Sequence, residues 1–227
     1  MLKLEEREMK NVFKILSRQK SVKTDNLKTL LSPLGEVKVI LDVEGDIGGH
    51  TGMTGRWKSN TTAWDILFKD LEEEYTWIIE DDVAFNKETI EFIFNKFKSK
   101  EVDLISNWIK HNKDCSNWGW WTLLNDFPDV IASQTWKSLN CFCRISPNLI
   151  RKVKSFIKKH EKGLFHEILL PTLAETREDF RAEEFKSYFD KSCYHWSQKK
   201  VLLDNIEDGR VYHPVKSDDK HKEICRL

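Results

Sequence analysis

Three consecutive acidic residues, Glu80, Asp81 and Asp82, follow a short apolar run. The run at positions 75–79 is aromatic and β-branched, which predicts a buried strand that ends at the acids. Three adjacent carboxylates repel one another unless a cation or the donors of a bound ligand lie between them. Ligands of open α/β sheets bind at the carboxyl ends of strands. The pattern therefore predicts a divalent metal site, and the alternative is that the acids are solvated loop residues or helix caps. In an extended chain, Glu80 and Asp82 would point to the same side.

A second acidic strand end and a glycine-rich loop come before this motif. The segment EVKVILDVEGD predicts a strand, and Asp42 with Glu44 at its end could accept hydrogen bonds from a base or a ribose. Five of the nine glycines then fall between positions 45 and 55. The amides of such a loop can approach a phosphate closely. Arg56 and Lys58 follow directly, which favours an anion-contacting lid over a simple connection, although the loop matches no Walker or Rossmann motif.

Two motifs further along the chain could complete a site for a metal and a diphosphate. Glu167 lies in GLFHE, at the start of the apolar run ILLPTLA. A helix N-terminus there would keep the carboxylate ionised and ready to act as a base, and the structural alternative is a helix cap. In YHPVK, His213 could be a nitrogen ligand, because Pro214 holds it in extended backbone, and Lys216 could contact a phosphate.

The elements that must position these residues alternate between strands and helices in the first half of the chain. We expect strands at 11–19, 36–46, 75–79 and 101–109, and helices at 24–35 (capped by Thr24 or Asp25), 61–73 and 87–98. This order predicts an α/β fold with a mostly parallel central sheet and helices on both faces. The second half is less regular, and its clearest signal is a helix that starts at Ser146-Pro147 and ends near Gly163.

The tryptophans and cysteines each allow two interpretations. Five of the nine tryptophans fall between positions 108 and 136, where they could pack under a long loop or offer a flat platform to a sugar ring or a base. Five cysteines form no CxxC pair. Cys141 and Cys143 alternate along a predicted strand, which favours buried reduced thiols over a disulfide or a zinc site.

The composition narrows the class of protein. Lys and Arg number 37, as do Asp and Glu, so the chain of 227 residues lacks the basic excess of a general nucleic-acid binder. No apolar stretch has the length of a membrane span, and the start MLKLEEREMK carries acids where a signal peptide is apolar. We therefore expect a soluble, cytoplasmic protein with no nucleic-acid partner. Residues 217–227 are expected to form a charged, solvated tail.

The order of EDD, FHE and YHPVK resembles that of GT-A-fold glycosyltransferases, from about residue 12 to 216. The resemblance is closest to the small inverting enzymes of bacteria and large DNA viruses. It implies a single catalytic domain, with a nucleotide-sugar half at about 12–105 and an acceptor half at about 106–216. In that family a DxD-type motif holds Mn²⁺ or Mg²⁺ on the donor diphosphate. Here Glu80, Asp81 and Asp82 take its place, with Glu instead of the first Asp.

The resemblance also implies roles for single residues. Asp82 would ligate the metal, Glu80 would contact water or the ribose, and a late histidine would complete the metal shell, with His213 favoured over His195. Glu167 would be the base for an inverting transfer of a sugar, from a UDP-sugar by family frequency, to a hydroxyl of a glycan. A retaining reaction stays open if Glu167 is not positioned for this. The implied donor-binding residues are Asp42, Arg56, Lys58, Glu80, Asp81 and Lys216.

Two rival functions remain at this point. A metal-dependent phosphohydrolase or nuclease could use the same acids, but it would need a second ligand group, for which Asp126 and Asp129 are the nearby candidates. A carbohydrate-binding protein could use the tryptophans as its platform. Such modules are usually all-β, whereas this chain has a βα rhythm.

Overall fold

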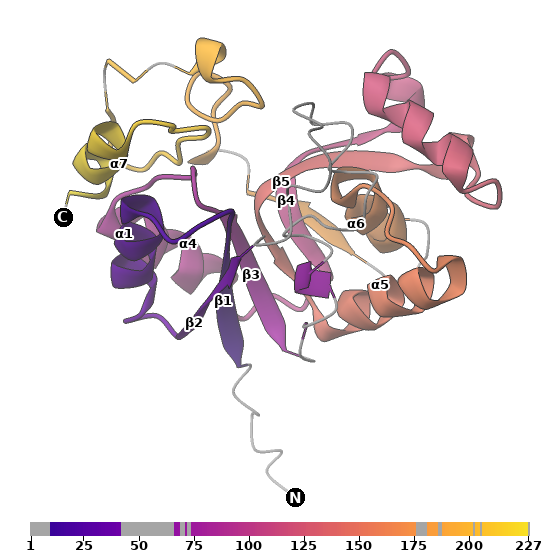
Figure 1. The fold of residues 1–227 in the computed structure, drawn as a ribbon, viewed down its shortest axis with the longest axis horizontal. Helices are drawn as coiled ribbons and strands as arrows, with labels where there is room; N and C mark the ends of the chain where they lie inside the picture. Colours follow the sequence, from indigo (N-terminus) through magenta and orange to yellow (C-terminus); the bar gives the residue numbers. More distant parts are fainter. Residues whose placement is uncertain are drawn as a thin grey trace, which may run out of the picture.

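The computed structural model describes residues 10–41, 66–68, 71, 74–175, 181–185, 188–201, 203–204 and 206–226. Its strands are β1 (Asn11–Ser17), β2 (Glu36–Leu41), β3 (Tyr75–Glu80), β4 (Leu104–His111), β5 (Trp136–Ile145) and β6 (Ala182–Glu184). Its main helices are α1 (Val22–Leu31), α4 (Lys87–Phe97), α5 (Pro147–His160), α6 (His166–Glu175) and α7 (Asp218–Cys225) (Figure 1).

The strands form one sheet in the order β2-β1-β3-β5-β4-β6. Strand β1 pairs in parallel with β2 and β3, and β4 pairs in parallel with β6. Strand β5 lies between β3 and β4 and runs antiparallel to both. Five of these strands therefore share one direction and β5 opposes them, which confirms an α/β fold with a mostly parallel, mixed sheet.

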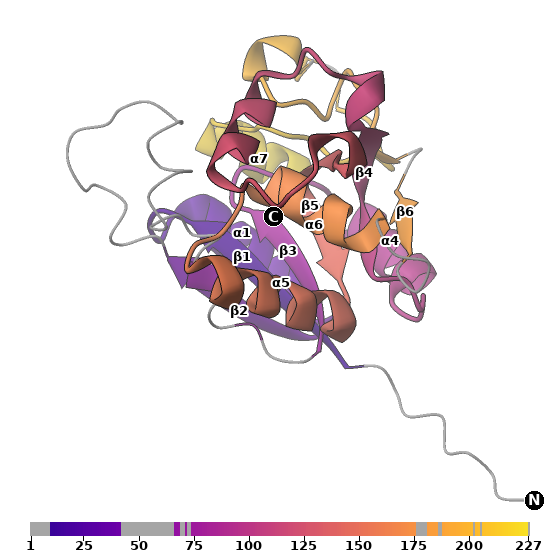
Figure 2. The ribbon, with the colours of Figure 1, turned by 90° about the vertical axis from the view of Figure 1, so that its right-hand side faces the viewer.

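Helices cover both faces of this sheet. Along β3, Trp77 and Ile79 belong to the apolar cluster shared with α1 and α4, whereas Ile78 belongs to the cluster shared with α5 and α6. This alternation follows from the period of two along a strand. Figure 2 shows α5 and α6 in front of the sheet, with α1 behind it. The carboxyl end of β3 therefore leaves the sheet between two apolar layers.

Helix starts follow local capping signals. The predicted start at Ser146-Pro147 is confirmed, because Ser146 Oγ accepts a hydrogen bond from the backbone N–H of Leu149. Helix α1 starts earlier than expected: Ser21 is its cap, and the side chain of Thr24 completes a capping box as the third helical residue. Helix α5 ends at His160, before Gly163, because Glu161 takes a left-handed conformation. Most of the expected helix at 61–73 lies outside the described residues.

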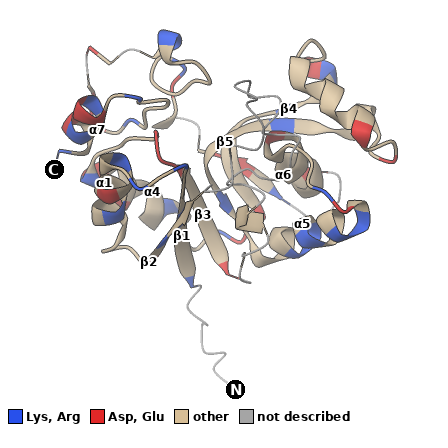
Figure 3. Cartoon of the chain, in the orientation of Figure 1, with Lys and Arg blue, Asp and Glu red and all other residues tan. Residues whose placement is uncertain are grey.

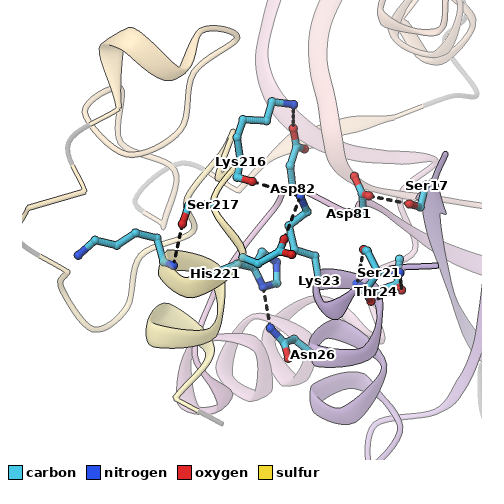
Figure 4. A network of polar contacts seen from close by, with 12 residues as sticks. Ser17, Ser21, Lys23, Thr24, Asn26, Asp81, Asp82, Lys216, Ser217 and His221 are labelled. Atoms are coloured by element: carbon cyan, nitrogen blue, oxygen red, sulfur yellow. Dashed lines mark hydrogen bonds and ion pairs between the residues drawn. The ribbon is translucent and has the colours of Figure 1, made fainter. Parts of the chain in front are cut away.

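The expectation of a solvated tail is wrong. Residues 218–225 form α7, and its residues His221, Ile224 and Cys225 are buried. They recur at the spacing of one helical face, which the high charge of the segment conceals. His221 Nε2 donates to the carbonyl of Val83 (2.9 Å), and its Nδ1 accepts from Asn26 Nδ2 (3.2 Å) on α1. The C-terminal helix is thereby joined to α1 and to the turn after β3 (Figure 4).

Candidate active site

The acidic motif forms a turn at the end of β3. The backbone N–H of Val83 donates to the carbonyl of Glu80 (3.0 Å), so the chain is not extended here as the sequence argument assumed. Glu80 and Asp82 nevertheless line the same cavity. Asp81 does not line it: its carboxylate accepts a hydrogen bond from Ser17 Oγ (2.6 Å) at the end of β1 (Figure 4). The turn thus separates the middle acid from its two neighbours, and the donor-binding role of Asp81 stays a prediction.

The C-terminal segment holds this turn in place. Ala84 and Tyr212 exchange two backbone hydrogen bonds of 2.9 and 2.8 Å. The N–H of Val215 donates to the carbonyl of Asp82 (2.7 Å). Because residues 212–215 run beside residues 82–84, the side chain of His213 is brought to the acids from a distant part of the sequence.

Hydrogen bonding fixes the orientation of the His213 ring. Its Nδ1 donates to the backbone carbonyl of His195 (2.7 Å), and its Nε2 lies 3.3 Å from Asp82 Oδ1 and 3.7 Å from Glu80 Oε2. A ligating histidine typically has its second ring nitrogen bound to a carbonyl in this way. His195 itself is turned elsewhere, since its Nδ1 accepts from the N–H of Ser197 (3.1 Å). The structure therefore brings His213, and not His195, to the acids.

The charges of this cluster are coupled. Although burial opposes ionisation, His213 and Lys216 hold the pKa of Asp82 well below its usual range. Burial would also raise the pKa of Glu80, but its interaction with His213 lowers it. Burial disfavours the His213 imidazolium, yet the carboxylate of Asp82 raises its pKa well above the ordinary value. The cluster thus holds two carboxylates balanced by an imidazolium and by Lys216, whose ammonium contacts Asp82.

The donor set fits a divalent cation. Asp82 Oδ1 is buried and, within the described part of the chain, accepts no hydrogen bond of good geometry. Ligand atoms of Glu80, His213 and Cys141 all lie within 4.8 Å of one another. This group offers one carboxylate, one imidazole and one thiol, and Asp82 Oδ1 lies 3.3 Å from the same His213 Nε2. Cys141 is the neighbour that sequence reasoning missed, because only the pairing of β3 with β5 brings it to Glu80. Cys141 and Cys143 are buried free thiols, as predicted.

A cavity of about 590 Å³ opens beside this cluster. Its wall contains Glu80, Asp82, His213 and Lys216, with Glu167 from the first turn of α6. Aromatic side chains from four parts of the chain also line it: Trp108, Trp118 and Trp120, Phe165, and Trp196. Figure 1 shows the segments around 120 and around 195 on opposite sides of the upper edge of the sheet. The cavity thus joins four of the predicted site residues to Glu167.

Strand β5 determines where Glu167 lies. The buried side chain of Asn140 donates through Nδ2 to the carbonyl of His166 (2.9 Å), the first residue of α6. Asn140 Oδ1 accepts from the hydroxyls of Ser106 and Ser138, each at 2.6 Å. Asn140 was not singled out from the sequence, since a lone Asn in an apolar strand gives no signal of its partners.

The protonation state of Glu167 differs from the expectation. Burial and the negative charge of Glu80 raise the pKa of Glu167 to about 8, even though Lys137 and His213 oppose the rise. A helix N-terminus favours the carboxylate by only about 1 kcal/mol or less. Burial is therefore the stronger effect here, and Glu167 is largely protonated at neutral pH.

Some tryptophans of the cluster pack in the protein, and others line the cavity, so each of the two interpretations holds for part of the cluster. Trp121 packs edge-on against Trp118 and donates through Nε1 to the carbonyl of Cys115 (2.9 Å), so it serves packing. Trp118 and Trp120 face the cavity and pack on Phe165, with ring centroids 6.1 and 5.2 Å away. Part of the cluster is thus core and part is an accessible aromatic wall.

Trp108 reaches the cavity through a local distortion of β4. The β4–β5 register shifts on both sides of Asn107, and Trp108 has φ 53°, in the left-handed region. A bulky residue rarely adopts this conformation, and such strain is concentrated at functional sites. The ring then packs against His195, with centroids 5.5 Å apart.

The other predicted residues fall into two groups. Asp42, Arg56 and Lys58 are outside the described residues. Asp126 and Asp129, the candidates for a second metal group, are exposed and do not line the cavity, and Asp129 pairs with Lys159 instead. Figure 3 shows Lys and Arg side by side along α5, away from the acidic turn.

Two further findings bear on the class of protein. Within the described ranges, each helix is too short or too polar to cross a membrane. In comparisons with known proteins, no family model matches the chain and no curated protein matches it in sequence.

Proposed function

We propose that the chain is a GT-A-fold glycosyltransferase that moves a sugar from a nucleotide-sugar, of which a UDP-sugar is favoured, to a hydroxyl of a glycan acceptor. One observation carries the proposal: a single cavity joins the Glu80–Asp82 pair, an oriented His213 and Glu167, and it has an aromatic wall. The position of Asp126 and Asp129 outside this cavity favours transfer over two-metal phosphate hydrolysis. The mixed α/β sheet favours it over an all-β sugar-binding module.

The acidic side of the cavity suits a diphosphate leaving group. Asp82, His213 and Glu80 would hold Mn²⁺ or Mg²⁺, and the bound cation would offset the negative charge that builds up on the leaving phosphate. Lys216 is the protein side chain that would add a second positive charge near the leaving phosphate. It contacts Asp82 in the free protein, and its mobile ammonium can turn to a phosphate oxygen when the donor binds.

Glu167 is proposed as the general base. It lies in the same cavity, on α6, with its backbone held to β5 through Asn140 and His166. Its pKa of about 8 is close to working pH, where a base both exists in its ionised form and accepts a proton effectively. Glu167 would take the proton of the acceptor hydroxyl while that oxygen attacks the anomeric carbon. A single displacement of this kind inverts the configuration.

The aromatic wall would position the acceptor. Trp118 and Trp120 line the same cavity as Glu167. The apolar face of a sugar ring packs well on such a surface, which orients its hydroxyls toward the polar groups.

The direct test is calorimetric titration of the full chain with UDP, with Mn²⁺ and then with EDTA. We expect UDP binding that requires the metal, that is lost in Asp82→Ala, and that is retained in the exposed control Asp126→Ala. Glu167→Gln should keep this binding and lose sugar transfer or hydrolysis of the UDP-sugar. Binding of UDP that ignores Mn²⁺, or no binding of UDP, GDP or dTDP, would contradict the proposal.

A further inference from the structure

One cation in the cavity wall is not used by the proposed chemistry. Lys137 lies on β5, is partly buried and lines the cavity. Its ammonium stands over the ring of Trp118, 4.5 Å from the ring centroid. The other lysine of the cavity wall, Lys216, is neutralised by Asp82. Lys137 therefore presents positive charge beside an aromatic surface on the acceptor side.

The surroundings of Lys137 increase this positive charge. In the register of β4 and β5, Lys110 lies directly opposite Lys137, and like charges placed opposite each other on antiparallel strands are destabilising. Among the described residues neither lysine forms an ion pair, although Glu167 acts on Lys137 through space and opposes the fall in its pKa. Burial also lowers the pKa of Lys137. An anion bound beside Lys137 and Lys110 would offset the loss of hydration of the Lys137 ammonium. It would also reduce the repulsion between the two lysines.

We propose that the acceptor is an anionic sugar, whose carboxylate or phosphate group is bound by Lys137 while its ring packs on Trp118. The identification of this ligand as an acceptor rests on the proposed function, but the binding of an anionic sugar does not. If the bound group is a carboxylate, the sugar is a uronic acid. If it is a phosphate, the sugar is a sugar phosphate.

An alternative role for Lys137 must be distinguished from this one. Lys137 also lowers the pKa of Glu167, so it could act only on the base. In that case its removal would shift the pH profile of transfer equally for neutral and anionic acceptors. It would leave the relative affinities of these acceptors unchanged.

The experiment compares three probes by tryptophan fluorescence and calorimetry, without nucleotide or metal. The probes are methyl β-glucuronide, a glucose phosphate and the neutral methyl β-glucoside. We expect the wild type to bind at least one anionic probe about ten-fold or more tightly than the glucoside, as for a hydrogen bond to a charged group. Lys137→Met should abolish this preference, and Lys137→Arg should keep it. The anionic probe that binds more tightly identifies the group.

A matched control is available beside another tryptophan of the cavity. Lys200 also stands over a tryptophan, with its ammonium 5.2 Å from the ring centroid of Trp196, but it does not line the cavity. Lys200→Met should leave the preference unchanged. Circular dichroism and thermal melting would verify that each variant is folded.

The inference is overturned if the wild type binds neither anionic probe more tightly than the glucoside. It is also overturned if the preference survives in Lys137→Met, which is the result expected if Lys137 acts only on Glu167. Because the probes contain no nucleotide, failure of UDP binding leaves this result standing, and a negative result here leaves the metal-dependent donor binding of the proposed function intact.

Discussion

Replacing Glu167 with Gln should stabilise the fold while it removes the proposed sugar transfer. The carboxyl group has its pKa raised from 4.5 to about 8, mainly by burial. A group with a raised pKa binds its proton more tightly in the folded state, so its contribution to stability is complete below pH 4.5 and is lost as the pH rises through 8. Glutamine fills the same space and carries no charge, so its contribution does not change with pH.

The size of the effect follows from the two pKa values. At pH 7 the difference between 4.5 and about 8 corresponds to about 3 kcal/mol of lost stability. Water has access to the cavity and screens the charge, which reduces this to roughly 1–3 kcal/mol. For a chain of this length, such a change corresponds to a rise in Tm of roughly 2–12 °C. The increase in Tm of Glu167→Gln over the wild type should be larger at pH 8 than at pH 5.

Thermal melts in EDTA at these two pH values would measure the effect. Glu88→Gln is a matched control, because Glu88 also lies in the first turn of a helix but is exposed. We expect that control to change Tm little at either pH. The reasoning is refuted if Glu167→Gln lowers Tm at pH 8, or if it raises Tm equally at pH 5 and pH 8.

Three further predictions concern the groups that build the site. His213→Ala should weaken Mn²⁺ binding about ten-fold or more and His195→Ala much less, by calorimetry, and the opposite order would exchange the two residues. Asn140→Ala should lower the free energy of unfolding in urea by about 1–3 kcal/mol, because it leaves buried hydrogen-bonding groups without a partner; an unchanged midpoint would contradict this. Burial lowers the pKa of His221 from 6.5 to about 4, so its contribution to stability, complete above pH 6.5, is lost as the pH falls through 4. Between pH 7 and pH 4 the free energy of unfolding should therefore fall by about 3 kcal/mol more in the wild type than in His221→Asn, as measured by urea denaturation. Equal decreases in the two proteins would show that His221 does not titrate as inferred.

Local patterns in the sequence were sufficient for several parts of the site. The aromatic and β-branched run at 75–79 is a buried strand, and the acids after it mark its carboxyl end. Glu167 is in the first turn of a helix, as the change to the apolar run at 168–174 predicts. These features depend on residues within one or two turns of each other, where side-chain periodicity and capping determine backbone conformation.

The protonation of Glu167 could not be predicted in this way. Its pKa depends on burial in the cavity and on the charge of Glu80, which is distant in the sequence. The sequence indicated only the helix N-terminus, whose effect is weaker than the loss of hydration. The same holds for α7, where the charged sequence hides a buried face that exists only because α1 lies against it.

The amino-acid sequence by itself determined the α/β class, the strand that ends in acids, and the helix that carries Glu167. Only the tertiary structure decided that β5 runs antiparallel between β3 and β4. That strand brings Cys141 and Lys137 to the cavity wall, and its Asn140 bonds the first residue of α6. The physical reason is that strand order and cavity walls depend on the packing of segments far apart in the chain. Residue periodicity reports only which face of an element is buried, and not what covers it.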